Sequence, residues 1–396
     1  MRDIGLSAIL VACLVIAAAV AFLLRRARTR RKARRRADPA SDYAMRADWQ
    51  RSIGTVNYSS FAYFDADRDG KYGPGDRPMA GIMVRLHDED GTFVSSSRTN
   101  NGGFANFAMS TTNGKAAIRF PNTYRFSVSV PPGWRSNSAN EIQSMLFQRL
   151  PGSPAGIVSQ QTPKPVGLSP LRSLAGRMAA RTSASLSVMR QGQVLETQVL
   201  AEASVFRFDL ADDADSVTIA GHGLDRRLAL SPYPTDLGLL SAEIAGIDRD
   251  ASVQTISFDD VTPLGFRKIP SGYAGLEWRN LNAMSRDYTK DSEGYVNGNV
   301  SGDYVGYTSS GHPAEFSCER PFGFHSVMLT AAWLKSEGET ALIESWLREE
   351  LIASDRVALS ALMPLHYAPM LKHVTRVRLS TEHYWQLVVD DLVLAR

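Results

Sequence analysis

Short apolar stretches that alternate with polar residues constrain the fold of this chain more than any other feature of its sequence. Apolar side chains recur at every second position in Ile82–Leu86, Tyr124–Val130, Ala184–Val188, Val205–Leu210 and Trp385–Val389. Gly, Pro, Asn and Asp separate such stretches about every ten residues. Alternation of this kind buries one face of a strand, so the pattern predicts an all-β body of two or three antiparallel β-sandwich domains.

The start of the chain has a different pattern. Ile4–Leu24 contains 21 residues without a charged side chain. At about 1.5 Å per residue, a helix of that length crosses a hydrocarbon core of about 30 Å. We therefore expect residues 1–24 to form one transmembrane helix. In a second interpretation, Leu10–Cys13 is a lipoprotein processing box and Cys13 is the lipidated residue.

Nine Lys and Arg residues lie between Arg25 and Arg36, in a segment 25–52 that we expect to be a basic juxtamembrane linker. Basic side chains in this place contact anionic lipid headgroups, so membrane lipid is an expected partner. The positive-inside rule puts the carboxyl side of the helix in the cytoplasm. An acidic loop described below favours the opposite orientation, with the bulk of the chain in the periplasm or on the cell surface, and the two signals conflict.

Charge is distributed unevenly along the chain. The whole sequence has 44 Lys and Arg against 41 Asp and Glu, a net charge of +3. Residues 1–36 hold ten of the basic residues and one acidic residue, so residues 37–396 hold 34 against 40, a net charge of −6. A nucleic-acid-binding protein needs a basic face on its folded domain, so we expect no nucleic-acid partner.

Composition divides the remainder into four segments. Residues 151–180 are rich in Pro, Gly and Ser and are predicted to be a linker. This segment separates a β-sandwich at 53–150 from a small β unit at 181–250, and a third unit covers 251–396. Within the third unit, Thr340–Ile352 places its large apolar residues on one face of a helix and is predicted to be helical.

One loop has the spacing of a calcium site. Carboxylates stand at its positions 1, 3, 5 and 12, a glycine stands at position 6, and the residue at position 7 offers its backbone carbonyl. Calcium takes six to eight oxygen ligands, and glycine permits the sharp bend that turns alternate carboxylates inward. The expected ligands are Asp65, Asp67, Asp69, Lys71 and Asp76, with Ca²⁺ as the cofactor. The alternative is an acidic turn that stays solvated.

The loop belongs to a longer pattern of motifs, Phe64–Gly70, Met79–Leu86, Thr99–Phe107 and Tyr124–Trp134. Over residues 55–140 this pattern resembles the B-type repeat domain of SdrD-like bacterial surface adhesins. The resemblance implies a transthyretin-like β-sandwich in which calcium stiffens a stalk outside the cell. Asn100 stands where that family usually has Asp, which puts in doubt any ligand from that turn.

The C-terminal unit is similar, through Gly272–Asn280 and Ala331–Trp333, to a jelly-roll β-sandwich common in secreted and PEP-CTERM-sorted bacterial proteins. Related architectures occur in carbohydrate-binding modules. The first and last strands of a jelly roll are neighbours, so four carboxylates near these strands are candidates for a second, structural cation. They are Asp259, Asp260, Asp390 and Asp391. The alternative is that they are ordinary strand-end acids.

Aromatic side chains in the C-terminal unit are candidates for ligand binding. A flat ring stacks on the apolar face of a sugar while polar neighbours bind its hydroxyls. The candidates are Tyr273, Trp278 and Trp333, each with a place in the core as its alternative.

Catalytic motifs are missing from the sequence. The seven histidines form no HExxH or other zinc spacing, and no G-x-S-x-G, P-loop or dinucleotide fingerprint occurs. We therefore expect a membrane-anchored, non-enzymatic surface or periplasmic protein, with a calcium-stiffened stalk and a terminal sandwich that binds glycan or protein. Two alternatives stay open. One is a cell-envelope polysaccharide hydrolase with Asp259 or Glu277 as acid and base, and the other is a cytoplasm-facing membrane scaffold.

Overall fold

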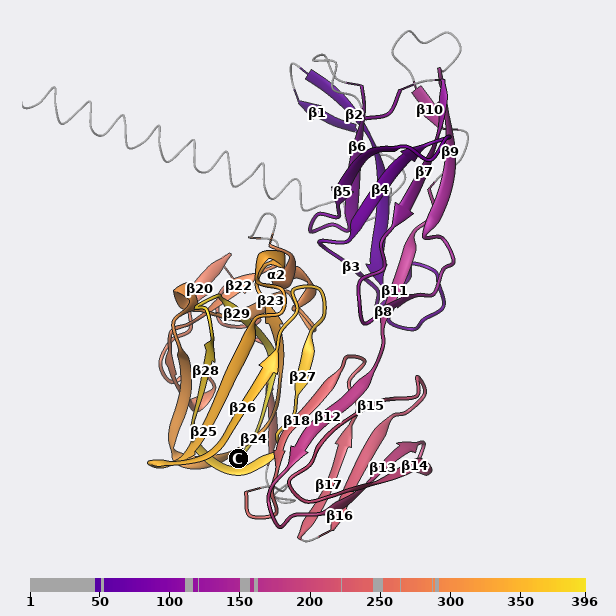
Figure 1. Ribbon diagram of the computed structural model, residues 1–396. Helices are drawn as coiled ribbons and strands as arrows, with labels where there is room; N and C mark the ends of the chain where they lie inside the picture. Colours follow the sequence, from indigo (N-terminus) through magenta and orange to yellow (C-terminus); the bar gives the residue numbers. More distant parts are fainter. Residues whose placement is uncertain are drawn as a thin grey trace, which may run out of the picture. The chain divides into compact units, whose positions relative to one another are not determined.

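The computed structural model describes residues 47–50, 53–110, 117–119, 121–149, 157–159, 163–221, 223–244, 252–263, 265–286, 288 and 292–396 (Figure 1). All of them belong to one compact unit, Ala44–Arg396. The predicted transmembrane helix and basic linker, including Cys13, lie outside the described residues. Within the described residues, no helix is both long enough and apolar enough to cross a membrane.

The described chain is all-β, with several sheets that form β-sandwich domains, as the alternating pattern predicted. The first sandwich consists of two sheets. One sheet contains β1 (Ala47–Gln50), β2 (Ile53–Phe64), β3 (Arg77–Pro78), β6 (Phe104–Ser110), β8 (Trp134–Ser136) and β11 (Val166–Pro170). The other contains β4 (Met83–Asp88), β5 (Phe93–Arg98), β7 (Asn122–Val128), β9 (Ile142–Arg149) and β10 (Ile157–Ser159).

Aromatic residues fill the core between these two sheets. Tyr58 from β2 and Phe126 from β7 lie with ring centroids 4.9 Å apart, and Tyr58 meets Phe147 from β9 edge-on at 4.8 Å. All three side chains are buried. Alternate positions of β7 are buried and solvent-facing, so the period of the sequence selects the face that packs.

The segment predicted to be a linker contains three strands, β10, β11 and β12 (Ser173–Met178). β11 lies parallel to β2, with Val166 opposite Ala62, and antiparallel to β8. Val166 and Leu168 have no exposed surface. The sequence did not predict β11, because its Pro and Gly residues are typical of a linker. Every residue of β11 is buried, so apolar and polar residues do not alternate along it.

A smaller sandwich follows, and the alternating stretches Ala184–Val188 and Val205–Leu210 both overlap its strands. Its outer sheet has the order β14-β13-β16-β17. These strands are β13 (Ala184–Arg190), β14 (Gln193–Leu200), β16 (Ser216–Gly221) and β17 (Leu224–Ala229). The facing strands are β12, β15 (Val205–Asp209) and β18 (Thr235–Leu240), which continue through β27 (Leu365–Tyr367) into the sheet of the C-terminal unit.

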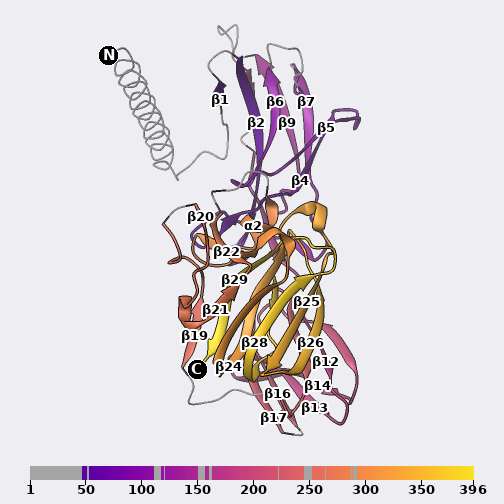
Figure 2. The same cartoon turned by 90° about the vertical axis from the view of Figure 1, so that its left-hand side faces the viewer.

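The C-terminal unit adds the remaining strands of that 14-stranded sheet (Figure 2). They are β19 (Val253–Ile256), β20 (Phe266–Lys268), β21 (Glu277–Arg279), β22 (Leu281–Ser285), β23 (Tyr304–Thr308), β24 (Ala314–Ala331), β25 (Thr340–Leu347), β26 (Glu350–Ala358), β28 (Leu371–Thr381) and β29 (Leu387–Ala395). Where the structure describes this unit, its helical elements are α2 (Glu293–Asn297) and three 3₁₀ turns, Tyr273–Gly275, Ser309–Gly311 and Leu334–Ser336. β19 pairs with β29, so the first and last strands are neighbours, as expected.

The predicted helix at Thr340–Ile352 is wrong. This segment contains β25 and the start of β26, joined by a turn in which Arg348 has a positive φ of 57°. Ala341, Ile343 and Ser345 are buried at every second position, which is the period of a strand. Pairing of β25 with both β26 and β28 decides the conformation here, because tertiary context overrides local helix propensity.

Candidate metal centre

The acidic loop runs from the end of β2 at Phe64 to the start of β3 at Arg77. Three of its residues have a positive φ, Arg68 at 63°, Gly70 at 72° and Gly75 at 94°. A Cβ atom at Gly70 would lie 2.9 Å from the carbonyl oxygen of Asn137. Glycine at position 6 therefore permits both the bend and the close approach of the loop to the segment after β8.

Three of the predicted ligands converge. Asp65, Asp67 and Asp76 each offer one carboxylate oxygen, and these oxygens all lie within 4.8 Å of one another. Asp65 is 1% exposed, Asp76 is half-buried and Asp67 is exposed, so the group opens to solvent on one side. Asp69 lies outside this group. Its Oδ1 instead accepts a hydrogen bond of 2.7 Å from the backbone N–H of Lys71.

Backbone and amide donors hold the carboxylates in place. Asp65 Oδ2 accepts hydrogen bonds from Gly70 N–H at 3.0 Å and from Asn137 Nδ2 at 2.9 Å. Asp76 accepts from Ala66 N–H at 2.9 Å through Oδ1 and from Gly73 N–H at 2.8 Å through Oδ2. Asp65 Oδ1 is buried and has no hydrogen-bond partner. Among the described residues, one buried carboxylate oxygen of the loop thus has neither a hydrogen bond nor a counter-charge in contact with it.

The charges of the loop act on one another. Burial raises the pKa of Asp76, and the neighbouring charges of Asp65 and Asp67 raise it further, against the two backbone N–H groups that lower it. Burial and then the charge of Asp65 raise the pKa of the Tyr63 hydroxyl above its usual range. The loop is therefore a region of unbalanced negative charge on the part of the chain that the structure describes.

A cation would balance this charge. An unpaired buried carboxylate oxygen is costly, and a bound metal ion removes that cost. The donor set consists of oxygen atoms alone, which suits a hard divalent cation and not a thiolate- or imidazole-seeking transition metal. The open side leaves room for water ligands. The partly buried triad of Asp65, Asp67 and Asp76 therefore fits a metal of this class.

The four carboxylates proposed for a second cation use their oxygens differently. Asp390 is fully buried, and its Oδ2 accepts from Val300 and Ser301 N–H at 2.7 and 3.1 Å. Asp259 Oδ1 accepts from Asp303 N–H at 2.7 Å. Asp260 instead accepts from Tyr273, and Asp391 from Ser301 Oγ at 2.6 Å. Within the described residues, only the triad in the first sandwich brings three metal-ligand side chains together.

The three aromatic candidates lie in different surroundings. Trp278 is 6% exposed, packs against Phe258 and Phe316, and belongs to the main core of the C-terminal unit. Trp333 is half-buried against Trp385. Tyr273 is half-buried, and its hydroxyl donates a hydrogen bond of 2.5 Å to Asp260 Oδ1. Tyr273, Asp259 and Asp260 line one open cavity of about 270 Å³.

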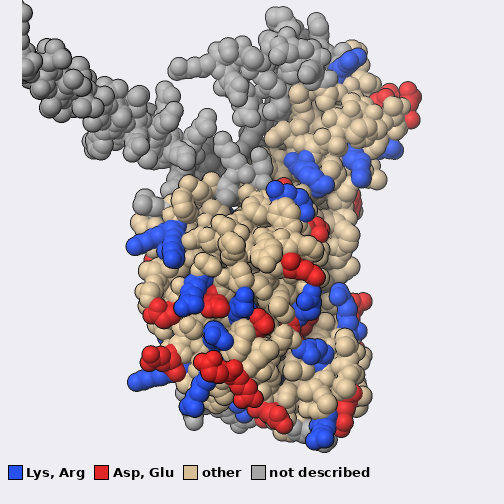
Figure 3. All heavy atoms as spheres, turned by 60° about the vertical axis from the view of Figure 1, so that its left-hand side comes forward, with Lys and Arg blue, Asp and Glu red and all other residues tan. Residues whose placement is uncertain are grey.

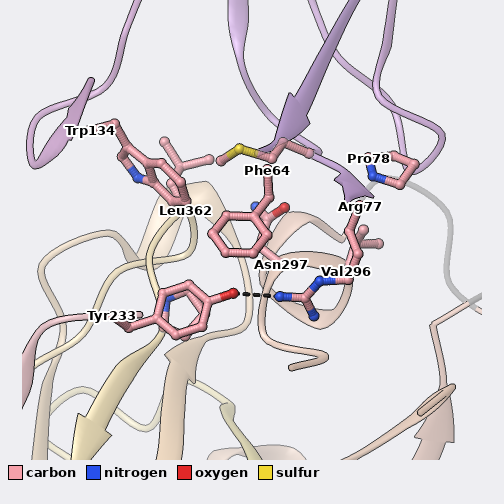
Figure 4. A pocket seen from close by; sticks show the side chains of 10 residues that line it. Phe64, Arg77, Pro78, Trp134, Tyr233, Val296, Asn297 and Leu362 are labelled. Atoms are coloured by element: carbon pink, nitrogen blue, oxygen red, sulfur yellow. Dashed lines mark hydrogen bonds between the residues drawn. The ribbon is translucent and has the colours of Figure 1, made fainter. Parts of the chain in front are cut away.

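Sequence reasoning missed a junction that adjoins the acidic loop. Arg77, directly after Asp76, points away from the first sandwich into a small pocket lined by Phe64, Tyr233 and Asn297 (Figure 4). Its guanidinium donates to the Tyr233 hydroxyl at 2.5 Å and to the carbonyl of Asn299, and lies 5.1 Å from the centroid of the Phe64 ring. No local pattern marks Arg77, because its partners are 156 and 222 residues away.

Two further arginines link the first sandwich to the small sandwich. Arg68, inside the acidic loop, and Arg135, in β8, form ion pairs of 2.9 and 2.5 Å with Asp212 in the small sandwich. Elsewhere, acidic and basic side chains are interspersed over the face shown in Figure 3. The acidic loop thus contains the candidate metal ligands and is tied to the next sandwich by arginines within it and beside it.

Comparisons with known proteins give no close relative. No protein-family model matches the chain, and no curated protein matches it. The shaft pilin SpaA from Lactobacillus rhamnosus GG aligns at 12% identity over 46% of this chain and 97% of the pilin, with a TM-score of 0.19. An adhesin domain of Lys-gingipain from Porphyromonas gingivalis aligns at 11% identity over 37% of this chain and 98% of that domain, with a TM-score of 0.23. The major pilin of Streptococcus pyogenes aligns at 7% identity over 78% and 96%, with a TM-score of 0.17. Identities and TM-scores this low do not establish a shared fold with any of the three.

Proposed function

We propose that this chain is a non-enzymatic surface protein whose first sandwich binds calcium and thereby becomes a stiff stalk. The observation that carries the proposal is Asp65 Oδ1, a buried carboxylate oxygen without a partner, inside a group of three converging carboxylates. The anchor in this proposal is the apolar segment Ile4–Leu24, and the bulk of the chain lies outside the cytoplasm.

Calcium suits the loop better than magnesium does. Magnesium demands a near-ideal octahedron and gives up its water reluctantly, whereas calcium accepts six to eight oxygens in irregular positions. Three carboxylates from one loop, two of them fixed by backbone N–H groups, offer such an irregular set. Sites of this kind in extracellular modules have dissociation constants of about 10⁻⁴–10⁻³ M, which supports a location where calcium is abundant.

Stiffening follows from what the loop contacts. Arg68 directly follows Asp67 and pairs with Asp212 in the small sandwich. Arg77 directly follows Asp76 and donates to the Tyr233 hydroxyl. An ion that holds the loop in one conformation also holds the backbone from which these two arginine side chains extend. Calcium would therefore restrict motion between the first sandwich and the small one, which is the mechanical requirement of a stalk.

A calcium titration of the full chain tests the proposal. After treatment with a chelator, thermal unfolding and calorimetry are followed with increasing Ca²⁺, and with Mg²⁺ at the same ionic strength. We expect saturable binding and a higher melting temperature with Ca²⁺ and a smaller shift with Mg²⁺. Asp65→Asn should abolish the calcium effect, while Glu89→Gln, in an exposed turn, should retain it. Absence of any shift at millimolar Ca²⁺, or an equal shift in Asp65→Asn, would contradict the proposal.

The ligand-binding part of the proposal has support at the cavity beside Tyr273. The cavity combines one aromatic ring with carboxylate, hydroxyl and amide groups, a mixture that suits a hydroxyl-rich ligand such as a glycan. A glycan array probed with the wild-type chain and with Asp260→Asn tests it. Binding by the wild type that is lost in Asp260→Asn supports a glycan site there. Equal binding by both would place the site elsewhere, and a uniformly silent array would favour a protein ligand or a purely mechanical role.

A further inference from the structure

The small sandwich has one long strand with an open edge. β14 is the last strand of its sheet and, within the described residues, pairs with β13 alone (Figure 1). The backbone N–H and C=O groups along its other edge therefore have no ladder partner in the part of the chain that the structure describes. Every residue from Gln193 to Thr197 is exposed, and so is Val199. An open edge of this kind is a template for pairing with another strand.

Apolar side chains are exposed along this edge. Val194 is 58% exposed, Leu195 38% and Val199 84%. β14 contains no Lys, Arg or Pro, the residues that commonly protect an edge strand from pairing. β17, the opposite edge of the same sheet, exposes the charged side chains of Asp225 and Arg227 instead. Of the two edges of this sheet, β14 is therefore the one suited to association.

The sequence of β14 is chemically symmetrical about Thr197. In each direction one polar residue comes first and two apolar residues follow, namely Glu196, Leu195 and Val194 on one side and Gln198, Val199 and Leu200 on the other. Two copies of this strand can pair antiparallel with Thr197 opposite itself. Glu196 of one copy then lies opposite Gln198 of the other, and Leu195 opposite Val199. Apolar residues meet apolar residues, and no carboxylate faces another carboxylate.

A bulge limits the length of such a pairing. The register between β13 and β14 shifts at Leu195, because Val188 lies opposite Glu196 and Met189 opposite Val194. A bulge bends an edge strand and interrupts regular pairing. Regular pairing along the open edge is thereby centred on Glu196–Gln198, with Leu195 at its end. Within this segment Thr197 Oγ1 is hydrogen-bonded to Ser187 Oγ on β13 at 3.0 Å, which fixes the side chain at the centre.

We propose that β14 is a self-association edge, which pairs antiparallel with β14 of a second copy of this chain across a twofold axis at Thr197. The two four-stranded sheets then form one continuous sheet, and Leu195 and Val199 of the two copies cover each other. The occupant is a second copy, because the strand is complementary to its own sequence. A twofold contact uses both open edges, so association stops at a dimer.

Sedimentation equilibrium of the full chain over a range of concentrations tests the proposal, in one mild detergent and with a calcium chelator throughout. We expect a monomer–dimer equilibrium in the wild type. Gln198→Glu places a carboxylate opposite Glu196 twice in the dimer and should weaken association by about tenfold. Gln198→Lys places an ammonium there and should strengthen association by about tenfold. Arg227→Glu, at an exposed position of β17, is the control and should leave the dissociation constant unchanged.

Cross-linking tests the twofold axis directly. Directly opposed residues of an antiparallel pair have Cα atoms about 4.5–5.5 Å apart, a separation that a disulfide spans. Thr197→Cys should therefore form a disulfide-linked dimer under mild oxidation. Arg227→Cys and the wild type, which retains the free Cys318, should give little of it. A monomer at every concentration, equal dissociation constants for Gln198→Glu and Gln198→Lys, or equal cross-linking of Thr197→Cys and Arg227→Cys would overturn the proposal. Because chelator is present, these outcomes do not depend on the calcium loop.

Discussion

Asn137 donates a hydrogen bond of 2.9 Å from Nδ2 to Oδ2 of Asp65, the most buried carboxylate of the candidate metal centre. The same amide reaches Ser169 Oγ on β11, and Ser169 Oγ in turn donates to the Asp65 carbonyl at 2.9 Å. The first ligand of the loop is therefore held by residues from β11 and from the segment after β8. This arrangement uses Asp65 Oδ2 and leaves Oδ1 of the same carboxylate without a hydrogen-bond partner.

Replacing Asn137 with alanine should destabilise the chain in the absence of calcium. The substitution removes a charge-assisted hydrogen bond to a buried carboxylate, which is worth about 1.5–3 kcal/mol. Urea unfolding in chelator measures the loss. Asn140→Ala is the matched control, because Asn140 lies on the same loop and donates only to the neutral carbonyl of Pro165 at 3.3 Å. Equal losses in the two variants would show that Asn137 does not hold the Asp65 carboxylate.

Gly70→Ala should disrupt the metal centre. Its φ of 72° costs an alanine about 1 kcal/mol, and the new Cβ would lie 2.9 Å from the Asn137 carbonyl, so the loop must shift. We expect a lower melting temperature and weaker calcium binding. Gly73→Ala is the control in the same loop, since a Cβ there meets no atom within 4 Å. Calcium titration of both variants gives the comparison, and unchanged affinity in Gly70→Ala would refute the role assigned to the bend.

Three of the five residues expected to bind the cation, Asp65, Asp67 and Asp76, converge, because one short loop contains them all. Asp69 did not join them, because its carboxylate closes a tight turn onto Lys71 N–H. Sequence spacing indicates which carboxylates can point into the loop. Nearby backbone N–H groups that hydrogen-bond to a carboxylate can hold it elsewhere, as Lys71 N–H does for Asp69. The hydrogen bonds from Asn137 and Ser169 that also hold Asp65 come from segments distant in sequence, and spacing could not predict them.

The remaining failures have one physical origin. Thr340–Ile352 has a helical distribution of large residues, yet pairing of β25 with β28, about 35 residues away, favours a strand there. Arg77 and Arg226 carry no local signal either, because their acceptors lie 156 and 143 residues away in sequence. Long-range partners of single polar side chains cannot be inferred from periodicity, which reports only which face of an element is buried.

Arg77→Met should weaken the contact between the first sandwich and the rest of the unit. Methionine keeps much of the apolar volume over the Phe64 ring but leaves the buried Tyr233 hydroxyl without its partner, a loss of about 1–3 kcal/mol. We expect a lower melting temperature or the separation of one unfolding transition into two. Arg85→Met is the control, because Arg85 is exposed and donates only to Ser129 Oγ. Identical unfolding of both variants would exclude Arg77 as a structural link.

The stability of the chain should fall on acidification through the buried His366. Burial lowers the pKa of this imidazole from 6.5 to about 4, so the folded state keeps it neutral while the unfolded state binds a proton. The neutral imidazole therefore contributes fully to the free energy of unfolding above pH 6.5. This contribution is lost as the pH falls from 6.5 towards 4, at up to about 1.4 kcal/mol per pH unit. Burial also lowers the pKa of His325, so that residue changes the free energy of unfolding in the same direction. His366→Asn, which keeps a polar side chain able to hydrogen-bond to Thr235 Oγ1, should therefore have a shallower dependence of unfolding free energy on pH in this window. Urea unfolding at pH 4.5, 5.5, 6.5 and 7.5 measures it, with the exposed His312→Gln as the control that keeps the wild-type slope. An unchanged slope in His366→Asn would mean that the imidazole gains a proton without unfolding.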